Sequence, residues 1–484
     1  MPDSTEVVQT PIKQHEPGLF AAVREAVRGT RPNYDYTSGS IGRAILLLSV
    51  PMVLEMVMES VFVVWDIYMV GHIRGGAKEA VAAVGLTESM MVIVYTLGIG
   101  LSIGATAMVA RRTGERDAEG AARTAAQTIL LGLIVSLVLG ALGVAFAPRL
   151  LQLMGAEAAV VASGSNFTRV MLGANVSVMM LFLINGSFRG AGDAAVAMRV
   201  LWLANAINIL LGPCLIFGLG PFPELGVTGA AVATSIGRGT GALYAFSKLW
   251  RGGGRLHVTG QHFRPDTTLM RRILDLSGTA TFQVFVGMAS WIALTRIVSG
   301  FGSAAVAGNI IGMRIIMFAL LPSWGLSNAA ATLVGQSLGA GKPERAEQAV
   351  WRAGFYNMIF LGVVGLLFFA FADSIVGVFT QAASGPEVQA YGVACLRIIS
   401  SGFLFYAYGM VLTQSFNGAG DTRTPTLINV VVFWLWEIPL AWFLAFGLGM
   451  GPRGVFLAAA VAFSTLAVVS AYFFRRGRWK TKRV

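Results

Sequence analysis

The sequence predicts an all-α polytopic membrane protein with twelve transmembrane helices in two six-helix lobes. Three observations carry this prediction: the composition, the recurrence of long apolar spans and an internal repeat. Of the 484 residues, 55% are hydrophobic and only 12% are charged, whereas a soluble chain carries about 25% charged residues. So few charges exclude an ordinary cytosolic enzyme and a disordered protein. Two cysteines in the whole chain exclude a disulfide framework and a cysteine zinc cluster.

Apolar spans recur along the chain from Ile41 onward. Each has roughly 20 residues or more, which is the length a helix needs to cross about 30 Å of hydrocarbon. We expect helices over residues 41–72, 79–110, 120–147, 158–189, 194–219, 226–250, 271–300, 303–338, 346–372, 386–417, 424–448 and 454–475.

Polar segments divide these spans into lobes. The most polar interior break runs from Arg251 to Pro265 and separates six spans from six. No apolar core precedes a small-residue cleavage site in the first 40 residues, so no cleaved signal is expected. We expect a cytoplasmic N-terminal tail (1–40), an N-terminal lobe (41–250), a cytoplasmic linker (251–270), a C-terminal lobe (271–475) and a basic cytoplasmic tail (476–484).

The basic residues predict the orientation of the chain. If the N-terminus is cytoplasmic, 27 Lys and Arg side chains lie in or beside segments on its side, against Arg74, Lys78, Arg149 and Arg453 on the other. This asymmetry places both termini in the cytoplasm. The net charge of +12 therefore reports orientation and contact with anionic lipid, and no nucleic-acid partner is expected.

An internal repeat relates the two lobes. The motif SFRGAGD at 187–193 recurs as SFNGAGD at 415–421, with six identities in seven at an offset of 228, and FGLG at 217–220 recurs at 446–449 with an offset of 229. Collinear matches at nearly constant offset indicate duplication. Because six spans per repeat is an even number, both halves have the same membrane orientation and a pseudo-twofold axis along the membrane normal.

Three carboxylates in the first span are candidate functional residues. At 100° per residue, Glu59 lies about 40° and Asp66 about 20° from Glu55, so all three share one stripe. A carboxylate in hydrocarbon must be paired, hydrated or protonated, and the stripe predicts a cavity-facing surface that binds protons or cations. The alternative is structural pairing with an arginine, for which the candidates are Arg169, Arg238 and Arg314.

Other polar residues lie inside the predicted spans. Asn205 and Asn208 stand three apart on one face of the fifth span, where they can bond the first-span acids or join helices. Pro51 kinks the first span or is tolerated there without a switching role. The role of Glu437, between Trp436 and Pro439, stays open between support of the second-half cavity and pairing with an arginine.

From about Ile41 to Phe474 the chain resembles a bacterial member of the multidrug and toxic compound extrusion (MATE) family. The resemblance rests on WDIYMVG at 65–71, GVTGAAVAT at 226–234 and the two GAGD turns at 190–193 and 418–421. It implies two six-helix lobes around a V-shaped cavity, and antiport of organic, often cationic compounds against protons or sodium. The DinF-like branch is the closer match.

The resemblance also implies a cation site in the N-terminal lobe. Asp66 matches the family's first-helix aspartate, Asn208 its fifth-helix asparagine and Thr234 its sixth-helix threonine, and Asn185 in the fourth helix is a further candidate. The DinF-like branch carries an aspartate four residues after that asparagine, where this chain has Gly212. Either Glu55 or Glu59 replaces its charge, or the ion site is altered. The acidic positions of the NorM-like branch fall at about Met288 and Tyr406, so its carboxyl-lobe site is absent here.

We therefore expect a secondary antiporter of the bacterial inner membrane, functional as a monomer among membrane lipids, that exports amphipathic compounds by alternating access. Its coupling ion is a proton or sodium, held by Asp66 with Glu59, Glu55, Asn205, Asn208, Thr234 and Asn185. No enzyme activity, cofactor or resident metal is expected, and the substrate-binding residues are unknown. One alternative is a flippase for a lipid-linked intermediate, which requires a strongly cationic cavity lined by Arg169, Arg238 and Arg314. A passive channel is a second.

Overall fold

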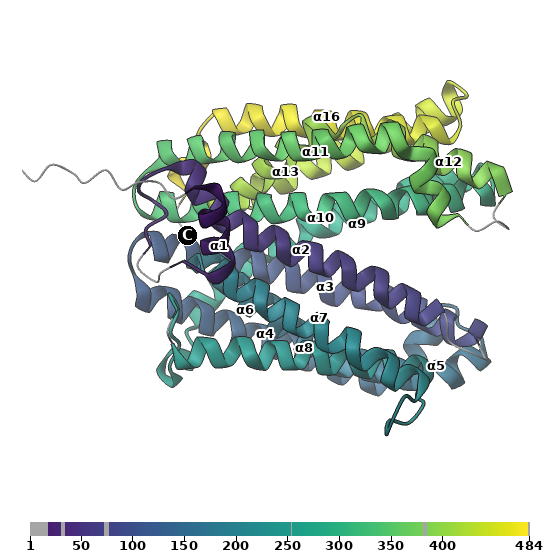
Figure 1. Ribbon diagram of the computed structural model, residues 1–484, viewed down its shortest axis with the longest axis horizontal. Helices are drawn as coiled ribbons and strands as arrows, with labels where there is room; N and C mark the ends of the chain where they lie inside the picture. Colours follow the sequence, from purple (N-terminus) through teal and green to yellow (C-terminus); the bar gives the residue numbers. More distant parts are fainter. Residues whose placement is uncertain (1–17, 31–33, 72–76, 253, 381–384, 483–484) are drawn as a thin grey trace, which may run out of the picture.

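The chain folds into long helices that form two bundles, as the computed structural model in Figure 1 shows. The structure describes residues 18–30, 34–71, 77–252, 254–380 and 385–482, without the side chains of 66–68, 70, 71 and 77–81. The bundle of the first half contains α2 (Ile41–Gly71), α3 (Ala77–Gly114), α4 (Ala118–Leu153), α5 (Ala158–Gly173), α6 (Asn175–Ala191), α7 (Ala194–Phe217) and α8 (Gly226–Arg251).

The second half forms the other bundle. It contains α9 (Thr267–Ser299), α10 (Ser303–Gly339), α11 (Pro343–Phe379), α12 (Gly385–Ser400), α13 (Phe403–Gly418), a mixed unit made of α14 (Arg423–Asn429), η3 (Val430–Glu437), α15 (Ile438–Trp442) and η4 (Phe443–Gly447), and α16 (Pro452–Arg475). The short helices α1 (Leu19–Arg28), η1 (Gly260–Phe263) and η5 (Arg478–Thr481) lie outside the spans. In Figure 1, α1 and the C-terminus lie at one end of the molecule, called the terminal end here; α5 and α12 lie at the far end.

Each predicted span corresponds to one helix or to consecutive helical segments. In the described part of the chain, ten helices are long and apolar enough to cross a membrane, and α12 with α13 forms an eleventh span that is bent by 61°. The sixth predicted span is α8, a helix of 26 residues that carries Arg238, Lys248 and Arg251 and falls below that hydropathy criterion. The span predicted over 158–189 is divided at Ala174 into α5 and α6.

Local sequence signals explain where the helices begin and end. The Asp117 side chain accepts a hydrogen bond from the N–H of Gly120 at the start of α4, and Asp266 does the same for the first turn of α9. Such caps satisfy amide groups that have no partner within the helix. The repeated GAGD turn ends α6 and α13 in the same way, because Gly192 (φ 89°) and Gly420 (φ 81°) adopt the left-handed conformation that favours glycine.

Small residues let the two bundles approach closely. A Cβ on Gly100 of α3 would lie 2.0 Å from Thr281 Oγ1 of α9, and one on Gly104 would lie 2.2 Å from Ser277 Oγ. Within the first bundle, a Cβ on Gly237 of α8 would lie 2.5 Å from the carbonyl oxygen of Ala204 in α7. Glycines spaced four residues apart thus allow close helix packing here.

Candidate functional site

A cavity of about 550 Å³ lies between the two bundles. Its lining comes from α2, α3, α6, α7 and α8 of the first half and from α9, α10 and α13 of the second, and it is predominantly apolar. Along α3 it extends from Glu88 to Ala107. The acidic and basic side chains that line it among the described residues are Glu55, Glu59, Glu88, Arg189, Arg238 and Arg314.

Glu55 forms a buried ion pair with Arg189. Its Oε1 lies 2.8 Å from Nη1 of Arg189, and only 1% of Glu55 is exposed. The second terminal nitrogen of Arg189 lies 3.3 Å from Ser102 Oγ on α3. Arg189 belongs to the last turn of α6, where the helix dipole favours a cation. The charge of Glu55 on α2 is thus balanced by the Arg189 side chain of α6.

Glu59, one turn further along α2, has two partners. Asn205 Nδ2 on α7 donates to Oε2 of Glu59 at 3.1 Å, and Arg238 Nη2 on α8 lies 3.5 Å from Oε1. The Arg238 guanidinium also lies over the rings of Phe62 and Tyr95, 5.9 and 5.7 Å from their centroids. Aromatic faces stabilise a cation in an apolar setting. This arrangement realises both interactions considered from the sequence, the arginine pairing and the asparagine hydrogen bond.

Asn208 makes a different contact from its neighbour Asn205. Its Nδ2 donates to Thr234 Oγ1 on α8 at 2.8 Å, and Asn208 is buried. Neither Asn205 nor Asn208 belongs to the cavity lining. A Cβ on Gly212 would lie 3.7 Å from Asn208 Oδ1, which is an ordinary contact distance. A side chain at this position would therefore meet no steric conflict with Asn208. The side chain of Asp66 lies outside the described residues, and its contact with Asn208 stays a prediction.

Asn185 of α6 lines the cavity and is 3% exposed. Its Oδ1 has no hydrogen-bond partner among the described residues. A buried amide oxygen without a donor is free to accept from a ligand. Asn185 therefore adds a neutral acceptor to the polar groups of the mostly apolar wall.

The arginines of the cavity differ from those that the flippase alternative requires. Arg238 and Arg314 line the cavity, whereas Arg169 is bonded to Asn166 within its own helix. Three glutamates accompany the three arginines among the described lining residues, so the strongly cationic lining is not found in this part of the chain.

Arg189 was not among the site residues predicted from the sequence. The signal was present, because position 189 is the one mismatch between the two copies of the seven-residue motif, where the second copy has Asn417. Both residues line the cavity. Asn417 donates to Gln414 Oε1 at 2.8 Å and holds no acid. The duplicated turn thus places a cation on one side of the cavity and a neutral amide on the other.

The terminal end of the cavity is closed by contacts between the bundles. Gln336 Nε2 of α10 donates to the carbonyl of Gly190 at 2.9 Å, and Thr332 Oγ1 donates to the carbonyl of Arg189 at 3.2 Å. At the same end, Arg111 of α3 donates to the carbonyl of Lys482 at 2.6 Å.

Residues 34–39, which we call the N-terminal strap, cross this closed end. The Tyr36 hydroxyl donates to the carbonyl of Gly192 in the first half at 3.1 Å. From the second half, Arg345 donates to the carbonyls of Tyr36, Ser38 and Gly39 at 2.8 to 3.3 Å, and Lys342 donates to that of Thr37 at 2.9 Å. The strap therefore joins both bundles.

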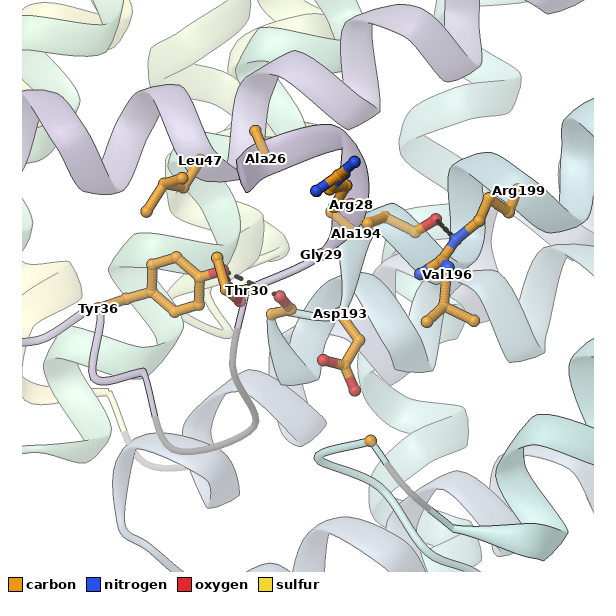
Figure 2. A pocket seen from close by; sticks show the side chains of 13 residues that line it. Ala26, Arg28, Gly29, Thr30, Tyr36, Leu47, Asp193, Ala194, Val196 and Arg199 are labelled. Carbon is orange, nitrogen blue, oxygen red and sulfur yellow. Dashed lines mark hydrogen bonds between the residues drawn. The ribbon is translucent and has the colours of Figure 1, made fainter. Parts of the chain in front are cut away.

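A smaller cavity of about 180 Å³ lies beside the strap. Figure 2 shows Tyr36 and Thr30 on one side of it and Asp193 below, with Arg28 and Arg199 near its other side. Burial raises the pKa of Tyr36 to about 12. Burial also raises the pKa of the Asp193 carboxyl, an effect opposed by the backbone N–H and the charge of Arg255. Asp193 is held by Arg255, whose backbone N–H donates to it at 2.7 Å.

Two helical bundles related by sequence duplication, with a partly charged cavity between them, define a membrane transporter. The family model MatE matches the chain twice, over residues 51–214 and 280–443. The chain therefore belongs to the MATE family of transporters, and the two matches coincide with the two repeats.

Individual relatives extend over nearly the whole chain. It is 25% identical over 444 residues to a "Probable multidrug resistance protein NorM" of Thermotoga maritima, covering 92% of this chain and 94% of that one. It is 24% identical to a "FAD transporter" of Shewanella oneidensis, covering 91% and 95%. A solved structure described as the outward-facing conformation of a multidrug resistance MATE family transporter matches with a TM-score of 0.85 at 25% identity, covering 92% of this chain and 98% of that one.

Proposed function

We propose that the protein is an ion-coupled antiporter that exports amphipathic, often cationic organic compounds across the bacterial inner membrane by alternating access. The observation that carries this proposal is the mostly apolar cavity of about 550 Å³ with glutamates held by arginines in its wall. Apolar walls with a few placed polar groups are typical of sites for small organic molecules. The relatives named for multidrug resistance and for FAD transport support a substrate of this size class.

Glu59 is the acid best placed to contact substrate. Its side chain is about a quarter exposed, unlike the buried Glu55, and its partner Arg238 is 3.5 Å away rather than in tight contact. A cationic substrate would compete with Arg238 for this carboxylate, while Phe62 and Tyr95 provide faces for its apolar part. Asn185 supplies a hydrogen-bond acceptor.

The proposed coupling site lies in the N-terminal lobe and consists of Asp66 with Asn208 and Thr234, supported by Glu59, Glu55, Asn205 and Asn185. A proton is favoured over sodium, because a carboxylate inside the membrane must be paired, hydrated or protonated. This site agrees with the DinF-like branch in its asparagine and threonine and departs from it at Gly212.

The proposed orientation has both termini in the cytoplasm. The distribution of basic residues supports it, and with it the closed terminal end is the cytoplasmic end. The described conformation then faces outward, in keeping with its likeness to an outward-facing relative. We further propose that the protein functions as a monomer, with its basic C-terminal tail against anionic lipid.

Dye efflux from proteoliposomes tests this function. The full-length protein should move a cationic dye uphill when a proton gradient is imposed, and Asp66→Asn should abolish the response to that gradient. Glu157→Gln, which removes an exposed acid at the start of α5, is the matched control and should behave as wild type. A normal response by Asp66→Asn would refute the coupling site, dye flux that only follows its own gradient would indicate a channel, and a response to sodium alone would make sodium the coupling ion.

A further inference from the structure

A second buried acid lies in the half of the chain that lacks the carboxylate stripe. Glu437 is 1% exposed and ends η3 in the middle of the unit from Arg423 to Gly447. It lies fourteen positions after Arg423 and ten before Gly447, which places it about 15 Å along the helix from the nearer end. It is therefore a carboxyl group deep inside a membrane-spanning unit.

Among the described residues, the Glu437 carboxyl has one hydrogen-bond partner, which is neutral. Ser290 Oγ on α9 lies 2.9 Å from its Oε2. Glu55 and Glu59 each have an arginine, but no Lys, Arg or His of the described residues forms an ion pair with Glu437 within 4.0 Å. An ionised carboxylate without a cation is costly in hydrocarbon, so this environment suits the protonated acid.

The helices packed around Glu437 place their charged groups near their ends. Tyr406 of α13, which is within electrostatic range of Glu437, stacks on Phe463 of α16. Arg296 lies in the last turn of α9, is exposed and donates to Ser299. The remaining titratable groups on α9, α13, α14 and α16 are Arg271, Arg272, Asp275, Tyr408, Arg423, Arg453, Tyr472 and Arg475.

Ser290 is arranged to serve both protonation states of Glu437. Its Oγ also lies 3.4 Å from the carbonyl oxygen of Phe433, in the π-helical turn that contains Glu437. A hydroxyl carries one proton and can donate to only one acceptor at a time. When Glu437 is ionised, Ser290 donates to the carboxylate. When Glu437 is protonated, it donates to Ser290 Oγ, and the serine proton turns to the carbonyl of Phe433.

The π-helical turn is also a structural difference between the two repeats. The repeat offset is 228 at the motif before this unit and 229 at the motif after it. The unit from Arg423 to Gly447 therefore contains one residue more than the corresponding segment of the first half, which is α7. A π-turn is the way in which a helix accommodates one extra residue, and it occurs frequently at functional sites. At the offset of 229 that holds at the motif after this unit, Glu437 corresponds to Asn208, the candidate coupling residue of the first half.

We propose that Glu437 is a proton-binding site of the second half, with Ser290 as the hydroxyl that adjusts to its protonation. The ligand is a proton, which the carboxylate takes up and releases as the transporter changes conformation. This inference rests on the proposed ion-coupled function. It adds a proton site to the half of the chain that does not contain the carboxylate stripe.

Infrared difference spectroscopy on the full-length protein in lipid tests the site without requiring transport. A pH change should produce a carboxylic-acid carbonyl band that Glu437→Gln removes. Ser290→Ala should raise the pH midpoint of that band by about one unit, because the ionised form loses its donor. Glu387→Gln, an exposed acid in the first turn of α12, should leave the band unchanged. The site is refuted if Glu437→Gln leaves the band intact or if Ser290→Ala leaves the pH midpoint of the band unchanged. If Glu437→Gln does not fold, the result for Ser290→Ala decides.

Proton counting then tests the role of the site. In proteoliposomes, the number of protons moved for each dye molecule should fall in Glu437→Gln relative to wild type and Glu387→Gln. An unchanged ratio would overturn the role of Glu437 in transport. Failure of the wild type to couple dye to any ion gradient would instead refute the proposed function, and the infrared titration would still report on the site.

Discussion

Replacing Arg189 by asparagine tests whether the buried pair with Glu55 stabilises the fold. Asparagine is the residue that the second copy of the motif carries at this position, as Asn417, so the backbone of the turn already tolerates it. The change leaves a carboxylate that is 1% exposed without its cation. Loss of one partner of a buried pair costs about 3–5 kcal/mol.

Protonation limits this cost. Neutralising a carboxyl group with an ordinary pKa of about 4.3 costs about 3.7 kcal/mol at pH 7, at about 1.36 kcal/mol for each pH unit, and about 1 kcal/mol at pH 5. We therefore expect Arg189→Asn to lower the free energy of unfolding by about 3–4 kcal/mol at pH 7 and by clearly less at pH 5. The loss is greater at the higher pH because the unpaired carboxylate must take up a proton.

Denaturant unfolding in detergent micelles measures both values. Glu55→Gln in the same chain is the matched partner, since a neutral amide removes the unpaired charge and should restore about 2 kcal/mol or more at pH 7. Equal stability of Arg189→Asn and the double variant at pH 7, or an equal loss at pH 5 and pH 7, would show that the pair does not stabilise the fold in the way argued here.

Three further predictions concern packing and the closed end. Gly100→Ala should lower the free energy of unfolding by about 1–3 kcal/mol, because the new Cβ would lie 2.7 Å from the backbone of Thr281; a melting temperature equal to wild type would contradict the close approach. Arg345→Ala should speed amide hydrogen exchange at the terminal end, since the strap loses its donors to three carbonyls, and unchanged exchange there would mean that the strap does not hold the end closed. Between pH 10 and 12, Tyr36 ionises in the unfolded chain but stays protonated in the folded protein. The free energy of unfolding of wild type should therefore fall by up to about 2.7 kcal/mol over this range because of Tyr36. Tyr36→Phe should lack this part of the pH dependence, and parallel stability curves for the two proteins would contradict the prediction.

The sequence predicted the spans because they depend on local hydropathy. Every one of the twelve corresponds to helix, since a backbone in hydrocarbon must satisfy its own hydrogen bonds. The bend between α12 and α13 was not predicted. At that bend, a Cβ on Gly402 would lie 3.0 Å from the carbonyl of Ala460 on α16, a tertiary contact that a single span does not reveal.

The partners of the cavity acids could be predicted only in part. Helical periodicity placed Glu55 and Glu59 on one stripe, and both line the cavity. Which arginine meets which acid depends on how α6 and α8 pack against α2, and periodicity within one helix does not contain that information. Arg238 was among the candidates for pairing, whereas Arg189, the last residue of the span predicted over 158–189, was not.

The N-terminal strap has a consequence for how the sequence of this region can vary. Lys342 and Arg345 reach only main-chain oxygens of the strap, and every amino acid supplies such an oxygen. Substitutions at Thr37 or Ser38 therefore leave these bonds in place, while insertion or deletion of a residue moves the oxygens out of reach. Homologous chains can therefore differ at these two positions and still keep the bonds to the second half, provided that the length of the segment is kept, whereas the bond to the first half also requires the Tyr36 hydroxyl.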